Sequence, residues 1–104
     1  MPNTDVFTAI ANPVRRRILE LLREGPRPAG SLVEEFQVNR PAISEHLQLL
    51  RLAGLVVEEA QGRQRIYRLK PGALDEVTQW LHPFETYWQQ RFAALRATLD
   101  EESP

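Results

Sequence analysis

Two short stretches of the chain carry side chains that can recognise a nucleic acid. The first lies between residues 40 and 48 and comprises, at helical spacing, Arg40, Pro41, Ser44, Glu45 and Gln48. Arginine can pair bidentately with guanine and glutamine with adenine, and glutamate can accept a hydrogen bond from cytosine. The second is the run Arg63-Gln64-Arg65, whose guanidinium groups can contact the phosphate backbone or enter a narrow minor groove. We therefore expect both stretches to contact double-stranded DNA.

Plainer interpretations remain open for several of these residues. Arg40 and Ser44 can instead cap a helix and fill its surface, and the two arginines of the second stretch can be ordinary exposed side chains. Phosphates repel Glu45, so this carboxylate either reads a cytosine or stays clear of the DNA. His46 lies at the flank of the first stretch. It can pack inside, contact a phosphate or read a base, and we include it among the expected DNA contacts.

The apolar pattern predicts the elements that position these residues. A short helix is expected over about residues 5–11. Asn12-Pro13 is a helix-start signal and Gly25-Pro26 a stop signal, so a second helix lies between them. A third helix is expected over about residues 28–37, followed by a short polar turn at residues 38–40.

The first polar stretch falls on the fourth expected helix, which Pro41 opens and Gly54 ends. Its apolar residues Ile43, Leu47 and Leu50 follow the i, i+4, i+7 spacing of an amphipathic helix. A helix, a tight turn and a second helix form the unit that places its second helix in the major groove of DNA. The sequence therefore predicts a helix-turn-helix over about residues 28–53.

The period then changes from helix to strand. The β-branched segment that begins at residues 55–57 and the segment 66–69 read as two strands. Gln61-Gly62-Arg63 supplies a polar, glycine-containing tip between them. We expect a β-hairpin over residues 55–69, called the wing below, which carries the second polar stretch beside the fourth helix.

After Pro71-Gly72 the helical period returns and runs to about residue 100, with Pro83 expected to kink or restart the helix. One long apolar stripe follows this last helix and includes Trp80, Phe84, Trp88, Phe92 and Leu95. A chain of this length cannot cover such a stripe alone, and dimer interfaces are rich in aromatic residues. We expect a helix-to-helix homodimer interface along this stripe. A small apolar effector among these rings is the alternative.

The short N-terminal helix has an apolar side of its own. That side comprises Val6, Phe7 and Ile10.

The distribution of charge separates a basic middle from acidic ends. Residues 13–70 hold eleven Lys and Arg against seven Asp and Glu, whereas the rest of the chain holds two against seven. The whole chain has a net charge of −1. A basic middle indicates one region that faces a polyanion. The run Arg15-Arg16-Arg17 either adds to that region or is a solvated helix face.

Length and composition narrow the class of protein. The 104 residues suffice for one domain, taken here as residues 1–104. The absence of cysteine excludes disulfides, thiolate ligands and cysteine nucleophiles. No run of 18 apolar residues and no N-terminal signal pattern occurs, so we expect a cytoplasmic protein without a membrane partner. We also expect no enzyme, because paired carboxylates, a Ser-His-Asp setting and a glycine-rich phosphate loop are all lacking.

Three segments together resemble the ArsR/SmtB family of bacterial winged-helix repressors: ANPVRRRILELL, RPAISEHLQLLRLAGLV and GRQRIYRL. The resemblance covers roughly residues 5 to 95. It implies a mainly α (α+β) fold, a winged helix-turn-helix with a β-hairpin wing and a long C-terminal dimerisation helix. It also implies a homodimeric, sequence-specific transcriptional repressor on a palindromic operator. The helices over about residues 5–11 and 72–100 would build the dimer interface, with Val6, Phe7 and Ile10 contributing from the first of them. Many members of that family release DNA when a metal binds.

The chain departs from the metal-sensing members of this family. Their thiolate site usually lies on the helix before the turn, where this chain reads Leu32-Val33-Glu34-Glu35-Phe36. The last helix offers Asp75, His82 and Glu85, which is fewer nitrogen or sulfur donors than a transition metal usually takes. We expect no cofactor and no metal, with a divalent metal near His82 as the alternative. A metal- or ligand-responsive sensor and a winged-helix protein-interaction module are the competing functions.

Overall fold

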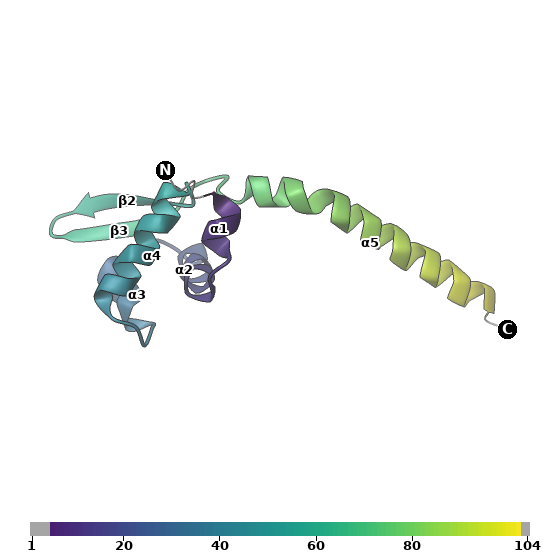
Figure 1. The fold of residues 1–104 in the computed structure, drawn as a ribbon, viewed down its shortest axis with the longest axis horizontal. Coiled ribbons are helices and arrows are strands. Elements are labelled where there is room, and N and C mark those ends of the chain that lie inside the picture. Colours follow the sequence, from purple (N-terminus) through teal and green to yellow (C-terminus); the bar gives the residue numbers. More distant parts are fainter. Residues whose placement is uncertain (1–4, 103–104) are drawn as a thin grey trace. The chain divides into compact units, whose positions relative to one another are not determined.

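The computed structural model describes residues 5–102, which fall into two compact units divided in the sequence between Leu74 and Asp75. The first unit contains, in chain order, α1 (Val6–Ile10), α2 (Pro13–Arg23), β1 (Arg27–Pro28), α3 (Ala29–Glu34), α4 (Arg40–Leu52), β2 (Val56–Gln61) and β3 (Gln64–Leu69). The second unit is the single helix α5 (Asp75–Glu102). Figure 1 shows the helices of the first unit gathered beside the β2–β3 hairpin. The expected mixed α+β class with a long C-terminal helix is confirmed.

Local signals fix where the two central helices begin. The Asn12 side chain accepts a hydrogen bond from the backbone N–H of Arg15 at 3.1 Å, and Pro13 occupies the first position of α2. The Asn39 side chain caps α4 in the same way, accepting from Ala42 N–H at 2.9 Å. These caps satisfy backbone donors that have no partner within their helix.

The core of the first unit joins its helices to the base of the wing. Its fully buried large side chains are Ile18, Leu32, Ile43, Leu47, Leu50, Leu55 and Val56. Burying each such aliphatic side chain contributes about 1.5–3 kcal/mol. Because α4 supplies three of them from one side, its opposite side faces outward, as the i, i+4, i+7 pattern predicts.

The sheet is antiparallel with the strand order β1-β3-β2. β1 places Arg27 opposite Tyr67, and β2 pairs with β3 from Val56 opposite Leu69 to the tip. Gly62 turns the tip with φ of 63°, a left-handed conformation that favours glycine. The sequence did not predict β1, because two residues are too short to show a strand period.

Two helices differ from their expected bounds. The third was expected over about residues 28–37 but covers only Ala29–Glu34, because the backbone N–H of Glu35 bonds back to Leu32 and Val33 and closes the helix. The last was expected to kink or restart at Pro83, yet it is assigned as helix without a break through that residue. A proline removes one backbone donor, and the hydrogen bonds on either side maintain the helix.

α5 is exposed along its apolar stripe within its own unit. Trp88 is 55% exposed and Phe92 is 62% exposed. The ring centroids of Trp80 and Phe84 lie 4.9 Å apart. Among residues 5–102, no helix has both the length and the apolar character that crossing a membrane requires.

Candidate nucleic-acid interface

The outward side of α4 presents most of the first predicted stretch to solvent. Arg40, Pro41, Ser44, Glu45 and Gln48 are all exposed. They lie opposite the buried side of the helix, so no core contact holds their side chains. α4 therefore has the one-sided polarity that a helix needs to enter a groove of DNA.

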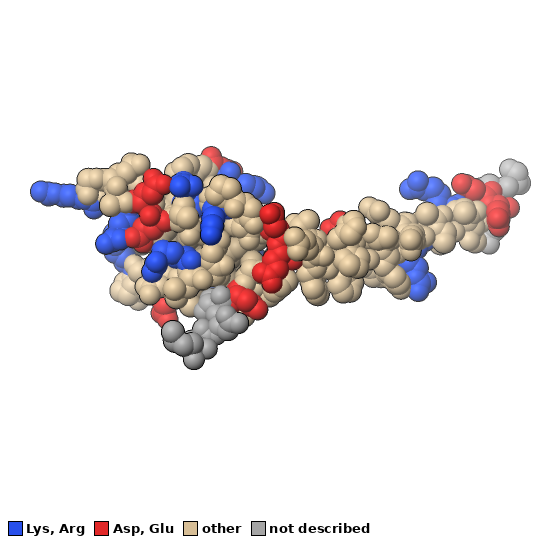
Figure 2. Space-filling view, turned by 90° about the horizontal axis from the view of Figure 1, so that it is seen from above, with Lys and Arg blue, Asp and Glu red and all other residues tan. Residues whose placement is uncertain are grey.

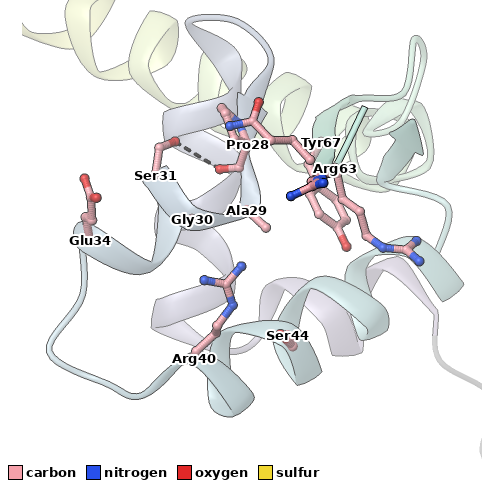
Figure 3. Close-up of a pocket in the computed structure, with 11 residues that line it drawn as sticks. Pro28, Ala29, Gly30, Ser31, Glu34, Arg40, Ser44, Arg63 and Tyr67 are labelled. Atoms are coloured by element: carbon pink, nitrogen blue, oxygen red, sulfur yellow. Dashed lines mark hydrogen bonds between the residues drawn. The ribbon is translucent and has the colours of Figure 1, made fainter. Parts of the chain in front are cut away.

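A hollow of about 550 Å³ lies between the start of α3, the first turns of α4 and the wing (Figure 3). It brings together five of the nine predicted DNA contacts, which are Arg40, Ser44, Arg63, Gln64 and Arg65. Its other lining residues were not predicted and include Pro28, Ser31 and Tyr67. The two predicted stretches, some twenty residues apart in sequence, thus form one continuous surface.

Two further predicted contacts lie beside this hollow rather than in it. Glu45 and Gln48 border a shallower hollow of about 410 Å³ together with Leu49 and Leu52. Leu52 is 59% exposed, so an apolar side chain continues the outward side of α4 toward its C-terminal end. Ser44 lines both hollows and marks where they meet.

The wing holds an internal cluster that sequence reasoning missed. The hydroxyl of Tyr67 donates a hydrogen bond to Oε2 of Glu58 at 2.6 Å, and Arg65 forms an ion pair with Oε1 of the same carboxylate. The strand register places Glu58 directly opposite Tyr67. A two-residue turn at Gly62-Arg63 would have predicted that pairing from the sequence alone, because cross-strand partners follow from the position of the turn.

The contacts within this cluster shift the pKa values of Glu58 and Tyr67. The hydrogen bond from Tyr67 is the main cause that lowers the pKa of Glu58, with a smaller lowering by Arg65. Burial, followed by the hydrogen bond to Glu58, raises the pKa of Tyr67 to about 12. Glu58 is therefore ionised and Tyr67 neutral over the physiological pH range. The Glu58 carboxylate partly compensates the positive charge of Arg65.

The arginines of the first unit differ in how far they are neutralised. Arg68 donates to Glu59 at 2.8 Å and Arg27 donates to Glu35 at 3.1 Å, so both are paired. Over residues 5–102, no carboxylate forms an ion pair with Arg40 or Arg63. Figure 2 shows basic side chains at the wing end of this unit with acidic ones among them. Arg40 and Arg63 thus offer the least compensated charge beside the hollow.

The run Arg15-Arg16-Arg17 is engaged within the chain. Arg15 and Arg16 donate to backbone carbonyls of α1, with Arg16 reaching Ile10 at 2.8 Å. Arg17 pairs with Glu20 at 3.3 Å on the exposed side of α2. Arg15 and Arg16 thus join α1 to α2, which the sequence did not predict, whereas Arg17 lies on a solvated helix face, one of the two roles expected.

His46 is half-buried on the side of α4 that faces α2, and its Nδ1 lies 3.2 Å from Nη1 of Arg15. Burial, and then the charge of Arg15, lower the pKa of His46, whereas Glu45 acts in the opposite direction. The ring therefore has a protein partner, and its role as a DNA contact stays a prediction.

The residues expected at a dimer interface fall in both units. In the first unit Val6 is only 4% exposed, while Phe7 and Ile10 are half-buried. Val6 thus contributes mainly to the core of its own protomer. In the second unit the expected residues are all exposed, namely Trp80, Phe84, Trp88, Phe92 and Leu95.

The metal-ligating residue types are scattered. Among the residues that the structure describes, no group of three or more His, Cys, Asp or Glu side chains could hold a metal ion. His82 lies exposed on α5.

Comparison with known proteins agrees with this geometry. Residues 12–57 match the family described as "Bacterial regulatory protein, arsR family". The chain is 36% identical to the transcriptional repressor SdpR of Bacillus subtilis over 80 residues, which span 77% of this chain and 89% of that protein. It is 34% identical to the HTH-type transcriptional regulator Rv2034 of Mycobacterium tuberculosis over 96 residues, which span 92% and 87% of the two chains.

A solved structure shows the same architecture. It is the solution structure of the homodimeric winged helix-turn-helix DNA-binding domain Mb0332 of Mycobacterium bovis, described as a possible ArsR-family transcriptional regulator. The TM-score is 0.60 at 28% identity, over 95% of this chain and 79% of that one. The fold is therefore a winged helix-turn-helix, in which α3 and α4 form the helix-turn-helix and β2 and β3 the wing.

Proposed function

The chain belongs to the arsR family of bacterial regulatory proteins, and on this basis we propose that it is a DNA-binding transcriptional repressor acting as a homodimer. The observation that carries the proposal is the single surface formed by the outward side of α4 and the arginines of the wing. Both relatives described above are transcriptional regulators, and SdpR is named a repressor.

In this proposal α4 enters the major groove while the wing follows the backbone. Arg40 and Arg63 neutralise phosphates, because their guanidinium groups face the hollow without a paired carboxylate among the described residues. Ser44 and Gln48 lie on the exposed side of α4 and contact base edges, which gives sequence specificity. Released counterions then supply much of the affinity.

Dimerisation would double this surface. The exposed aromatic stripe of α5 supports it, since single helices rarely leave several large rings open to water, and the related Mb0332 domain is homodimeric. Two copies of α4 spaced by one turn of DNA, about 34 Å, would read two half-sites of a palindrome.

The test is a fluorescence titration of labelled DNA, with the operator selected from fragments of the host genome. Affinity should fall steeply as salt rises from about 0.05 M to about 0.2 M. Arg63→Gln should weaken binding and flatten that dependence. The matched control is Arg17→Gln, which removes the same charge from the ion pair on α2 and should bind like the unaltered protein. Binding that is equal in both variants would reject the wing contact, and absent DNA binding would favour a protein-interaction module.

We also propose that operator binding requires no metal. The lack of cysteine and the scattered placement of His and carboxylate side chains among the described residues support this. Calorimetry with nickel, zinc and cobalt is the test. Heat of binding, coupled to release of DNA, would instead establish a sensor and would direct attention to His82.

A further inference from the structure

Arg15 connects three helices of the first unit. From α2, its Nε donates to the carbonyl of Ala9 at 2.7 Å and its Nη2 to that of Thr8 at 3.2 Å. Its Nη1 lies 3.2 Å from Nδ1 of His46 on α4. The last carbonyls of a helix lack partners within that helix, so one guanidinium both caps the C-terminal end of α1 and holds a side chain of the recognition helix α4.

This contact determines the protonation of the imidazole. A guanidinium has only donors and stays charged, so Nδ1 of His46 must accept the hydrogen bond from Arg15. The proton of the neutral ring is then on Nε2. A protonated ring would turn an N–H toward another N–H donor, lose the hydrogen bond and place two positive charges side by side.

The other groups around the ring do not offset that repulsion fully. α1 contributes neutral backbone carbonyls through Arg15, and α2 contributes Arg15 itself. On α4 the neighbouring Glu45 favours the protonated ring, but burial and Arg15 together outweigh it and lower the pKa of His46. α3 and β2 also pack against α4, and none of their charged groups is among those that act on this ring.

We propose that Arg15 is a positioning residue whose bond to neutral His46 ties α1 to the recognition helix, and that protonation of His46 releases this tie. The part concerning DNA rests on the proposed function: release loosens α4 against α1 and weakens operator binding. This direction is opposite to that of simple electrostatics, in which an added positive charge near phosphates strengthens binding.

The first experiment uses nitrogen NMR to measure the protonation state and tautomer of the His46 ring as a function of pH, in the protein without DNA. At about pH 7.5, Nε2 should carry the proton and Nδ1 should not. Arg15→Gln should raise the pKa of His46 toward its ordinary value and remove the tautomer preference. Arg16→Gln is the matched control, because it removes the same charge from the adjacent residue and caps α1 without reaching His46. A proton on Nδ1, or one titration curve shared by both variants, would overturn the proposal.

The second experiment measures operator affinity between about pH 7.5 and about pH 5.5. The unaltered protein should lose affinity about two- to tenfold relative to His46→Asn, which keeps an acceptor for Arg15 but cannot titrate. His82→Asn on α5 should retain the loss. Equal pH dependence in the unaltered protein and His46→Asn, or tighter binding at low pH, would overturn the coupling. If no variant binds DNA, the proposed function fails together with this part, while the NMR result still decides the tie.

Discussion

Replacing Tyr67 by phenylalanine removes one hydroxyl and leaves the buried ring in place. The lost hydrogen bond to Glu58 is 2.6 Å long and its acceptor is charged. Hydrogen bonds to charged groups contribute about 1.5–3 kcal/mol. Glu58 keeps its partner Arg65, and its side chain is 22% exposed, so water recovers part of the loss. We expect Tyr67→Phe to lower the free energy of unfolding by about 1–2 kcal/mol near neutral pH.

The pH dependence of the free energy of unfolding shows whether the Tyr67–Glu58 hydrogen bond causes the loss of stability. The hydrogen bond lowers the pKa of Glu58, so its contribution is present above the ordinary carboxyl value of 4.5 and is lost as pH falls through the lowered value. At the alkaline end, the pKa of Tyr67 is raised from 10.0 to about 12. The stabilisation linked to neutral Tyr67 is present below pH 10.0 and is lost as pH rises toward about 12.

Urea unfolding at fixed protein concentration measures both effects. The free energies of unfolding of the unaltered protein and Tyr67→Phe should differ near pH 7, and this difference should shrink below about pH 4. Glu58→Gln completes a double-mutant cycle, in which the two changes should be clearly non-additive. A difference that stays constant into the acid range, or additive effects, would refute the reasoning.

Three further perturbations test other parts of the structure. Leu47→Ala should lower the free energy of unfolding by about 2–5 kcal/mol, because Leu47 is 1% exposed in the core; urea unfolding measures this, and a loss below about 1 kcal/mol would contradict the packing. Asn39→Ala removes the cap of α4 and should cost about 0.5–2 kcal/mol, whereas Asn39→Asp should retain the cap and the stability. Trp88→Glu should shift the protein toward monomers in analytical ultracentrifugation, because it places a charge in the exposed stripe of α5, and an unchanged mass would exclude that stripe as the interface.

The parts of the fold that the sequence predicted depend on local chemistry. α2 follows the Asn12-Pro13 signal and α4 begins next to Pro41, as expected, and the capping bonds of Asn12 and Asn39 span only three residues. The i, i+4, i+7 spacing on α4 determined which side is buried, and the exposed polar side followed from it. The wing likewise required only a change of period and a glycine at its tip.

The rest depends on contacts between segments distant in sequence. β1 exists because Arg27 and Pro28 meet the edge of β3, which no local period could reveal. Long arginine side chains reach carbonyls or rings six to thirty-one residues away, so the partners of Arg15 required the arrangement of α1, α2 and α4. Pro83 was expected to kink or restart α5. The helix does not restart there, because a single missing donor does not outweigh the bonds of a helix of 28 residues.

The internal engagement of the arginines limits how strongly the protein attracts DNA from a distance. Arg15, Arg16, Arg17, Arg27, Arg65 and Arg68 all have acceptors within the chain. Four of them, Arg17, Arg27, Arg65 and Arg68, form ion pairs with carboxylates, so part of the basic charge is compensated. Random duplex offers little except phosphate charge and therefore attracts the protein less than the number of arginines suggests. We expect the repressor to select its operator because its affinity for non-specific DNA is low, rather than because its affinity for the operator is exceptionally high. Other sites in the genome should then compete little for the protein.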